Sequence, residues 1–204
     1  MDSKLPLYHW LVVLVPGSIF LSCIYFVLQV FGISIPTLNI PGSETVRAFV
    51  FLASALLTGE LLQAFGGIIE PILFWTWGGS PSKILLSEDK YKREVKELRI
   101  RFAGDLTKDE LFEKAMAYCN HHSLGRSEYF NTLYAYSRSL FTGTLFILAF
   151  MLFFSSANFH RPTFWYLVLF EIVVAIVLWH RTKKRGRIFA KEVTIQVALS
   201  ITQK

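Results

Sequence analysis

Four long stretches of this chain are almost entirely apolar, and polar or charged stretches separate them. The apolar stretches run from about 7 to 31, from 46 to 77, from 139 to 157 and from 163 to 180. About 17–25 apolar residues are enough for a helix to cross a hydrocarbon layer roughly 30 Å thick. The pattern therefore predicts an all-α membrane protein with four transmembrane helices.

The stretch from 46 to 77 is the longest of the four. As a single helix it would be roughly 48 Å long, which exceeds the hydrocarbon thickness. Gly66, Gly67 and Pro71 interrupt its second half, and Pro16 interrupts the first span. Proline removes a backbone N–H from the helical ladder, so we expect a kink at each proline.

The polar residues divide the chain into four segments. Residues 1–77 would form a first transmembrane hairpin, and residues 139–180 would form a second one. Residues 78–138 are rich in charge and would form a small helical insertion between the hairpins. Residues 181–204 would form a basic C-terminal tail.

The insertion opens with the spacing of an amphipathic helix. Tyr91, Val95, Leu98 and Phe102 follow one another at intervals of three or four residues. This spacing places them on one face of a helix. Residues 98–102 also alternate between apolar and basic side chains, as a strand would. We predict a helix because the helical pattern is the longer one.

Two further helices are predicted in the insertion. Gly104 ends the first helix, and Thr107 followed three residues later by Glu110 is the signature of a capping box that opens the second. A third helix would begin near Arg126. No helix breaker follows it, so we expect this helix to continue into the third span at about Ser139.

The basic residues indicate how the chain is oriented. One precedes the first span, eleven lie between 83 and 138 and seven lie after 180, whereas only Arg47 and Arg161 lie on the opposite side. Under the positive-inside rule, both termini and the insertion face the cytoplasm. We therefore expect a multi-pass protein of the cell (inner) membrane.

A basic cluster follows the fourth span directly. Its members are Arg181, Lys183, Lys184, Arg185 and Arg187. Anionic lipid attracts such a cluster by about 1 kcal/mol per charge. We expect the cluster to bind the inner membrane surface.

The last residues alternate between apolar and polar side chains in the manner of a strand. The apolar members are Val193, Ile195, Val197, Leu199 and Ile201. A lone strand has unpaired backbone groups, so it would bind a strand of a cytosolic partner protein. The alternative is an amphipathic helix packed on the insertion, because Phe189, Val193 and Val197 would share one helical face.

Acidic and amide side chains interrupt the apolar spans. Glu60, Gln63 and Glu70 share one face of the second span, and Glu171 lies in the middle of the fourth. Apart from Arg47 at the outer end of the second span, no Lys or Arg lies inside the predicted spans. A charged carboxylate is costly at mid-membrane. These residues, the polar stripe, are therefore either a water-filled or proton-accessible path or neutral side chains that hydrogen-bond between helices.

Small residues flank the polar stripe. Gly59 and Gly66 permit close approach of another helix under either interpretation. Four spans alone enclose little volume in which polar side chains could avoid lipid. We therefore expect a homo-oligomer with the second span at its interface.

The sequence lacks catalytic and metal-binding patterns. Cys119, His121 and His122 do not have the spacing that places metal ligands on one face. The charged and aromatic residues of 126–138 are typical of a juxtamembrane helix. No Ser-His-Asp, phosphate-loop or dinucleotide-binding pattern occurs. We expect no enzyme activity, metal, cofactor or direct nucleic-acid binding.

The outline of four spans, a helical insertion and a basic tail resembles the small membrane subunits of bacterial antiphage systems such as Kiwa. The resemblance implies a homo-oligomeric membrane sensor or effector that works with a soluble partner, and it transfers no functional residue. The sequence itself leads to a similar hypothesis, a membrane scaffold or sensor whose insertion and tail engage a cytosolic protein. The alternative is a channel-like or membrane-permeabilising effector that uses the polar stripe.

Overall fold

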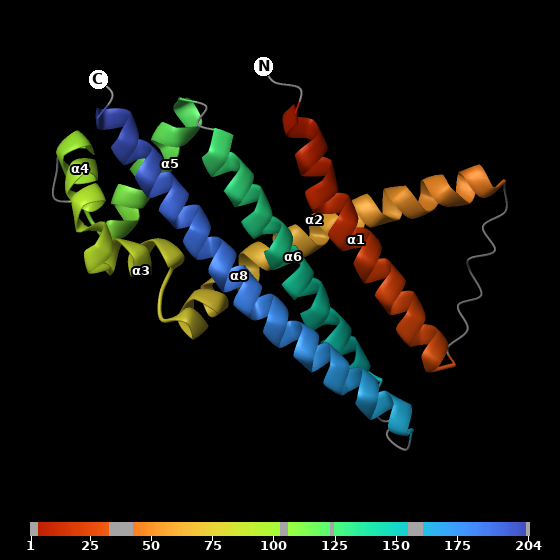
Figure 1. Ribbon diagram of the computed structural model, residues 1–204. Coiled ribbons are helices and arrows are strands. Elements are labelled where there is room, and N and C mark those ends of the chain that lie inside the picture. Colours follow the sequence, from red (N-terminus) through yellow and green to blue (C-terminus); the bar gives the residue numbers. More distant parts are fainter. Residues whose placement is uncertain (1–3, 33–42, 103–105, 123–124, 155–160, 203–204) are drawn as a thin grey trace. The chain divides into compact units, whose positions relative to one another are not determined.

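A computed structural model describes residues 4–32, 43–102, 106–122, 125–154 and 161–202 of the chain (Figure 1). These residues form helices and the turns between them, and no strand occurs among them. The elements are α1 (Lys4–Val30), α2 (Glu44–Trp77), α3 (Pro81–Ser87), the 3-10 helix η1 (Asp89–Tyr91), α4 (Lys92–Phe102), α5 (Lys108–His121), α6 (Gly125–Phe153) and α8 (Pro162–Thr202). The all-helical prediction is confirmed for this part of the chain.

Four of the helices are long and apolar enough to cross a membrane. The apolar segments lie in α1, α2, α6 and α8. Each corresponds to one of the stretches expected from the sequence, so the prediction of four helices long and apolar enough to span a membrane is confirmed. Pro16 and Pro71 lie inside α1 and α2, which continue as helices past them.

The chain forms two compact units. The first consists of residues 1–69 and 135–180, and the second of residues 70–134 and 181–204. The helices α2, α6 and α8 each contribute residues to both units. The second unit therefore combines most of the predicted insertion with the C-terminal tail.

The first unit is held together by apolar packing and by close helix contacts. A buried cluster joins α1, α6 and α8, and in it the rings of Phe31 and Phe164 lie 5.7 Å apart. Glycines bring α1 against α2, because a Cβ atom at Gly17 or Gly59 would overlap the backbone of the other helix. The close packing expected at Gly59 is thus confirmed.

The second unit has its own apolar core. It is built from Leu85, Leu86, Tyr91, Leu98, Leu111, Ala115, Cys119, Val193 and Val197. These residues come from α3, η1, α4, α5 and the end of α8. The tail is therefore part of this core.

The predicted C-terminal strand is wrong, because residues 193–202 continue α8 as a helix. Val193 and Val197 are fully buried in the core of the second unit, and Phe189 packs against the same core. These residues lie four apart, so one helical face buries all three. A helix also satisfies its backbone N–H and C=O groups internally, which a lone strand cannot do. The alternative helical interpretation is confirmed.

Local end signals set the limits of several helices. Gly78 and Gly79 have φ values of 84° and 136°, in the region that favours glycine, and they end α2. The Thr107 hydroxyl accepts a bond from the Glu110 N–H while the Thr107 N–H donates to the Glu110 carboxylate at 2.8 Å, as the capping box requires. Hydrogen bonds from the Thr107 side chain and backbone hold the pKa of Glu110 below its ordinary value.

The two remaining helix predictions for the insertion are also confirmed. Residues 92–102 are helical. In this helix Ile100 is 69% exposed, whereas the competing strand pattern would have placed it on one apolar face with Leu98 and Phe102. The helix α6 starts at Gly125 and continues without interruption to Phe153. Gly104 lies outside the described residues.

Candidate functional site

A cavity of about 190 Å³ lies within the second unit. Its lining residues are Glu70, Phe74, Ser80, Pro81, Ser82, Phe112, Tyr134, Gly186, Phe189 and Ala190. They come from α2, the start of α3, α5, α6 and α8. Among the described residues, the lining therefore combines one carboxylate, aromatic rings and hydroxyl groups, and it includes no basic side chain.

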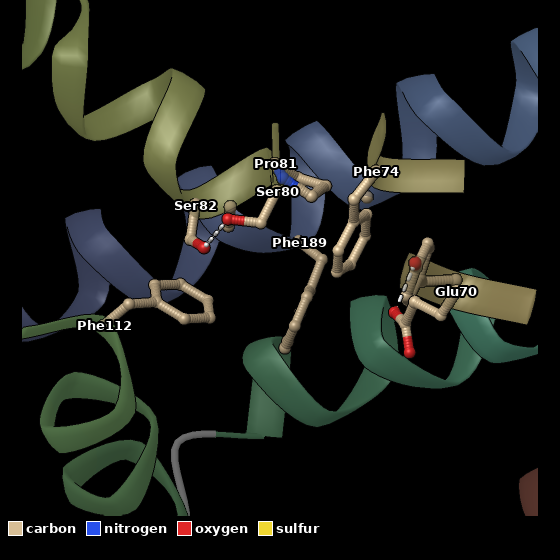
Figure 2. Close-up of a pocket in the computed structure, with 10 residues that line it drawn as sticks. Glu70, Phe74, Ser80, Pro81, Ser82, Phe112 and Phe189 are labelled. Atoms are coloured by element: carbon tan, nitrogen blue, oxygen red, sulfur yellow. Dashed lines mark hydrogen bonds between the residues drawn. The ribbon is translucent and has the colours of Figure 1, made fainter. Parts of the chain in front are cut away.

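Polar groups lie at both ends of this cavity. Figure 2 shows Glu70 on one side of Phe74 and Phe189, and Ser80 and Ser82 on the other. The Tyr134 hydroxyl donates a hydrogen bond of 2.6 Å to the Glu70 carboxylate.

The hydroxyl groups of Ser80 and Ser82 lie 3.0 Å apart. Ser80 also caps α3, because its side chain accepts a bond from the N–H of Lys83. The turn that ends α2 therefore also places the two hydroxyl groups at the cavity.

Aromatic rings form much of the cavity wall. The Phe189 ring lies parallel to the Tyr134 ring at 6.4 Å between centroids, and it meets the Phe112 ring edge-on at 6.0 Å. The Phe74 ring contacts the Trp77 ring at 5.6 Å. The walls of the cavity are therefore largely aromatic.

Gly186 allows α8 to pass close to this site. A Cβ atom there would lie 3.0 Å from Pro81 Cγ and 3.1 Å from Tyr134 Cε2. Sequence reasoning missed Gly186, Tyr134 and the cavity itself. One sequence feature could have indicated this close approach, the single glycine within the basic cluster. Glycine destabilises a helix relative to every other residue except proline, so its presence on a surface helix calls for a structural reason.

The polar stripe is divided between the two units. Glu60 and Gln63 belong to the first unit, whereas Glu70 belongs to the second, where it lines the cavity. Glu60 is exposed, and the buried Gln63 Nε2 has no hydrogen-bond partner within the described part of the chain. Only Glu70 of these three is therefore placed at the cavity.

Arg138 is a polar side chain of the first unit that the sequence analysis placed outside the spans. It lies inside the continuous helix α6, and it is half-buried. A Cβ atom at Gly66 would lie 3.2 Å from both Arg138 Cγ and Thr142 Oγ1. Gly66 thus gives the arginine side chain its space on α2. The sequence feature that indicated the position of Arg138 inside a continuous helix was the absence of a helix breaker between residues 126 and 139.

Glu171 also lies in the first unit, on α8. It is half-buried, and a hydrogen bond links its side chain to Thr144 of α6. Cys23 of α1 is close enough to interact with it electrostatically. The environment of Glu171 therefore combines three helices.

The five residues of the basic cluster are all helical, within α8. Arg185 donates a hydrogen bond of 3.0 Å to the Leu133 carbonyl, and Arg187 forms an ion pair with Glu88. Arg181 and Lys184 are exposed, and Lys183 is half-buried. Two arginines of the cluster thus also bind elements of the second unit.

The five tail residues singled out in the sequence differ in exposure. Val193 and Val197 are buried, Ile195 is half-buried and Leu199 is 58% exposed, while the side chain of Ile201 lies outside the description. The alternation therefore does not define a single exposed face.

Cys119 and its two histidine neighbours do not share one environment. The Cys119 thiol donates a bond of 3.9 Å to the Val193 carbonyl, and burial raises its pKa, which a hydrogen bond with Ser127 opposes. The His122 ring stacks on the Tyr118 ring at 3.9 Å, and the His121 side chain is exposed. Among the described residues, no three His, Cys, Asp or Glu side chains are grouped to hold a metal ion.

Comparison with protein-family models, with curated proteins and with solved structures gave no match to this chain.

Proposed function

We propose that this protein is an oligomeric integral membrane scaffold or sensor that engages a soluble cytosolic partner. The sharing of three long helices between the two units carries the proposal. The helices α2, α6 and α8 each pass from one unit into the other without a break. A packed helix responds to a shift at one end as a rigid element, so a change among the spans can alter the second unit.

Exposed apolar side chains of the second unit support the engagement of a partner. Ile100 on α4 and Leu199 on α8 are exposed at 69% and 58%. Large apolar side chains surrounded by charge are common where proteins bind one another.

The proposed orientation places both termini and the second unit in the cytoplasm, at the cell (inner) membrane. It rests on the excess of basic residues in the insertion and the tail over the two on the other side. Two exposed members of the basic cluster, Arg181 and Lys184, would contact anionic lipid there. The four-span outline extends the proposal to antiviral defence through its resemblance to antiphage subunits.

The oligomer and the partner can be tested on the full-length chain. Native mass spectrometry from lipid nanodiscs should show a homo-oligomer. A cytosolic protein should co-purify from the native host in stoichiometric amount, and Ile100→Ser should reduce its recovery while Lys114→Ser, an exposed change on α5, should not. A monomer in nanodiscs that retains no cytosolic protein would contradict the proposal.

A channel-like activity is a second candidate, favoured by two polar residues in α2. Glu60 is exposed on this span, and the Gln63 amide is buried without a described hydrogen-bond partner. Planar bilayers containing the purified protein separate the two functions. A scaffold should give no stepwise conductance. Discrete conductance steps that change in Glu60→Gln would establish the channel and replace the scaffold.

A further inference from the structure

The cavity of the second unit combines aromatic walls with an end that carries hydroxyl groups. We propose that it binds a small neutral aromatic compound of the phenol type, with the ring among the aromatic side chains and the hydroxyl group at Ser80 and Ser82. The proposal concerns a ligand of the second unit and does not depend on the scaffold function.

The cavity reaches into the interior of the second unit. Four of its lining residues, Pro81, Tyr134, Gly186 and Ala190, are buried. They come from α3, α6 and α8, so packing between helices forms this part of the wall. A ligand placed against it would leave water, which favours the binding of apolar surface.

The volume of the cavity limits the size of the ligand. At about 190 Å³ it lies below the roughly 300–1,000 Å³ of pockets for drug-sized ligands. An engineered apolar cavity of about 150 Å³ is large enough to bind benzene. The cavity therefore has room for one six-membered ring with a small substituent.

The walls favour a ligand ring that is itself aromatic. Phe74, Phe112, Tyr134 and Phe189 belong to four different helices, α2, α5, α6 and α8. The Phe189 ring lies parallel to the Tyr134 ring at 6.4 Å and meets the Phe112 ring edge-on at 6.0 Å. Offset-stacked and edge-to-face pairs of aromatic rings are stabilised beyond their contact area, whereas a saturated ring gains the contact area alone.

The hydroxyl groups of Ser80 and Ser82 favour a polar substituent on that ring. They lie at the end of the cavity away from Glu70 (Figure 2). Each hydroxyl carries one hydrogen, and the bond of 3.0 Å between them uses one of the two. Ser80 also accepts a bond from the Lys83 N–H, and neither hydroxyl makes a further bond within the described residues. One hydrogen is therefore left to donate to an oxygen of the ligand.

The remaining lining favours a neutral ligand. Glu70 accepts the hydrogen bond of 2.6 Å from the Tyr134 hydroxyl, so a ligand at the serine end needs no group from either residue. Moving a charged group from water to apolar walls costs far more free energy than moving a neutral one. A single aromatic ring with one hydroxyl group matches the volume, the walls and the polar end together.

The test uses the full-length protein in lipid nanodiscs, with empty nanodiscs of the same lipid as the blank, because phenol also partitions into lipid. Phenol and cyclohexanol have similar size and the same hydroxyl group, and both are titrated by calorimetry. Phenol should bind saturably at one site per chain, about threefold to tenfold more tightly than cyclohexanol. No saturable binding of phenol above the blank, or equal affinities for the two compounds, would overturn the proposal.

Substitutions in the wall assign the binding to this cavity. Ala190→Leu adds side-chain volume to the lining and should abolish phenol binding, while Phe74→Leu removes a ring and should weaken it several-fold. Phe49→Leu changes a ring of α2 that is 73% exposed and should have no effect. Unchanged phenol affinity in cavity variants that melt like the wild type would also overturn the proposal. If Ala190→Leu does not fold, Phe74→Leu carries the comparison.

Removal of both hydroxyl groups tests the polar end. Ser80→Gly combined with Ser82→Ala keeps glycine, a residue that is tolerated as a helix cap, in front of α3. This double variant should weaken phenol binding about fivefold and leave the binding of toluene, which has no hydroxyl group, unchanged. Ser87→Ala removes an exposed hydroxyl group at the end of α3 and should change neither affinity. An equal effect of the double variant on phenol and toluene would overturn the proposed orientation of the ligand.

Discussion

At the scale of single residues, the glycines of α2 distinguish helix contacts from open surface. A Cβ atom at Gly59 would overlap the carbonyl group of Val13 in α1, whereas a Cβ atom at Gly67 would meet no other element within 4 Å in the described part of the chain. The sequence could identify both as small residues in a span. It could not show which of them meets another helix, because that depends on the partner helix and its rotation.

This difference predicts opposite effects of the same substitution. Gly59→Ala should destabilise the first unit by about 1–3 kcal/mol, since the backbones of α1 and α2 would have to separate. Gly67→Ala should be neutral or stabilise by up to about 1 kcal/mol, since alanine favours the helix. Thermal unfolding of both variants in the same detergent measures the difference. Equal melting temperatures would show that α1 and α2 do not pack closely at Gly59.

Arg138 illustrates a second limit of residue-level reasoning. The sequence placed it at the end of the insertion, just before the third span, and the structure places it within the continuous helix α6, where Gly66 of α2 gives its side chain space. A charge inside an apolar helix is recognised only when the facing helix is known. The basic residues that count toward orientation are therefore best taken from segments well outside the spans.

At the scale of elements, the sequence predicted the helix ends that depend on neighbouring residues. It could not decide between helix and strand where both periodicities fitted the same segment. The capping box at Thr107 and the glycines after Trp77 act through neighbouring residues, so the sequence contained all the information they need. The tail fitted both a strand and a helix. The secondary structure of the tail depended on the core that α3, α4 and α5 form. These helices offer an apolar surface against which a helix can pack, and they offer no strand with which the tail could pair.

Burial in this core predicts which tail residues stabilise the protein. Val193→Ala should lower the free energy of unfolding by about 2 kcal/mol, because it removes two buried methyl groups and leaves a cavity. Leu199→Ala should change it by less than about 0.5 kcal/mol, because Leu199 is 58% exposed.

Thermal unfolding measures both tail variants. Deleting the chain from Val193 onward should lower the melting temperature more than either substitution does. A truncated protein that melts like the wild type would contradict the helical core.

At the scale of the whole molecule, the sequence predicted the four spans but not the cavity. Long apolar stretches report the membrane directly, because a fixed hydrocarbon thickness requires them. The cavity depends on residues from Glu70 to Ala190 that only folding brings together. Its tyrosine and glycine were indistinguishable from ordinary residues of a juxtamembrane helix until α2, α6 and α8 were placed in the second unit.

Orientation is a property of the whole chain, and the basic residues predict it. Seven basic residues follow residue 180 and ten lie between 83 and 126, while Arg47 and Arg161 are the ones on the other side of the predicted spans. The contribution of Arg138 can be removed without changing the sign of this bias. The insertion and the tail should therefore lie in the cytoplasm.

Cysteine labelling in intact cells tests this orientation. In a chain with Cys23 and Cys119 replaced by alanine, a thiol reagent that cannot cross membranes should label Ser43→Cys. It should label Lys96→Cys and Lys184→Cys only after the cells are permeabilised. All three original side chains are exposed, so access through the protein does not limit the reaction. Lys184 follows the fourth span within the same helix, and its labelling in intact cells would mean that α8 ends outside and that the charge rule does not govern this chain.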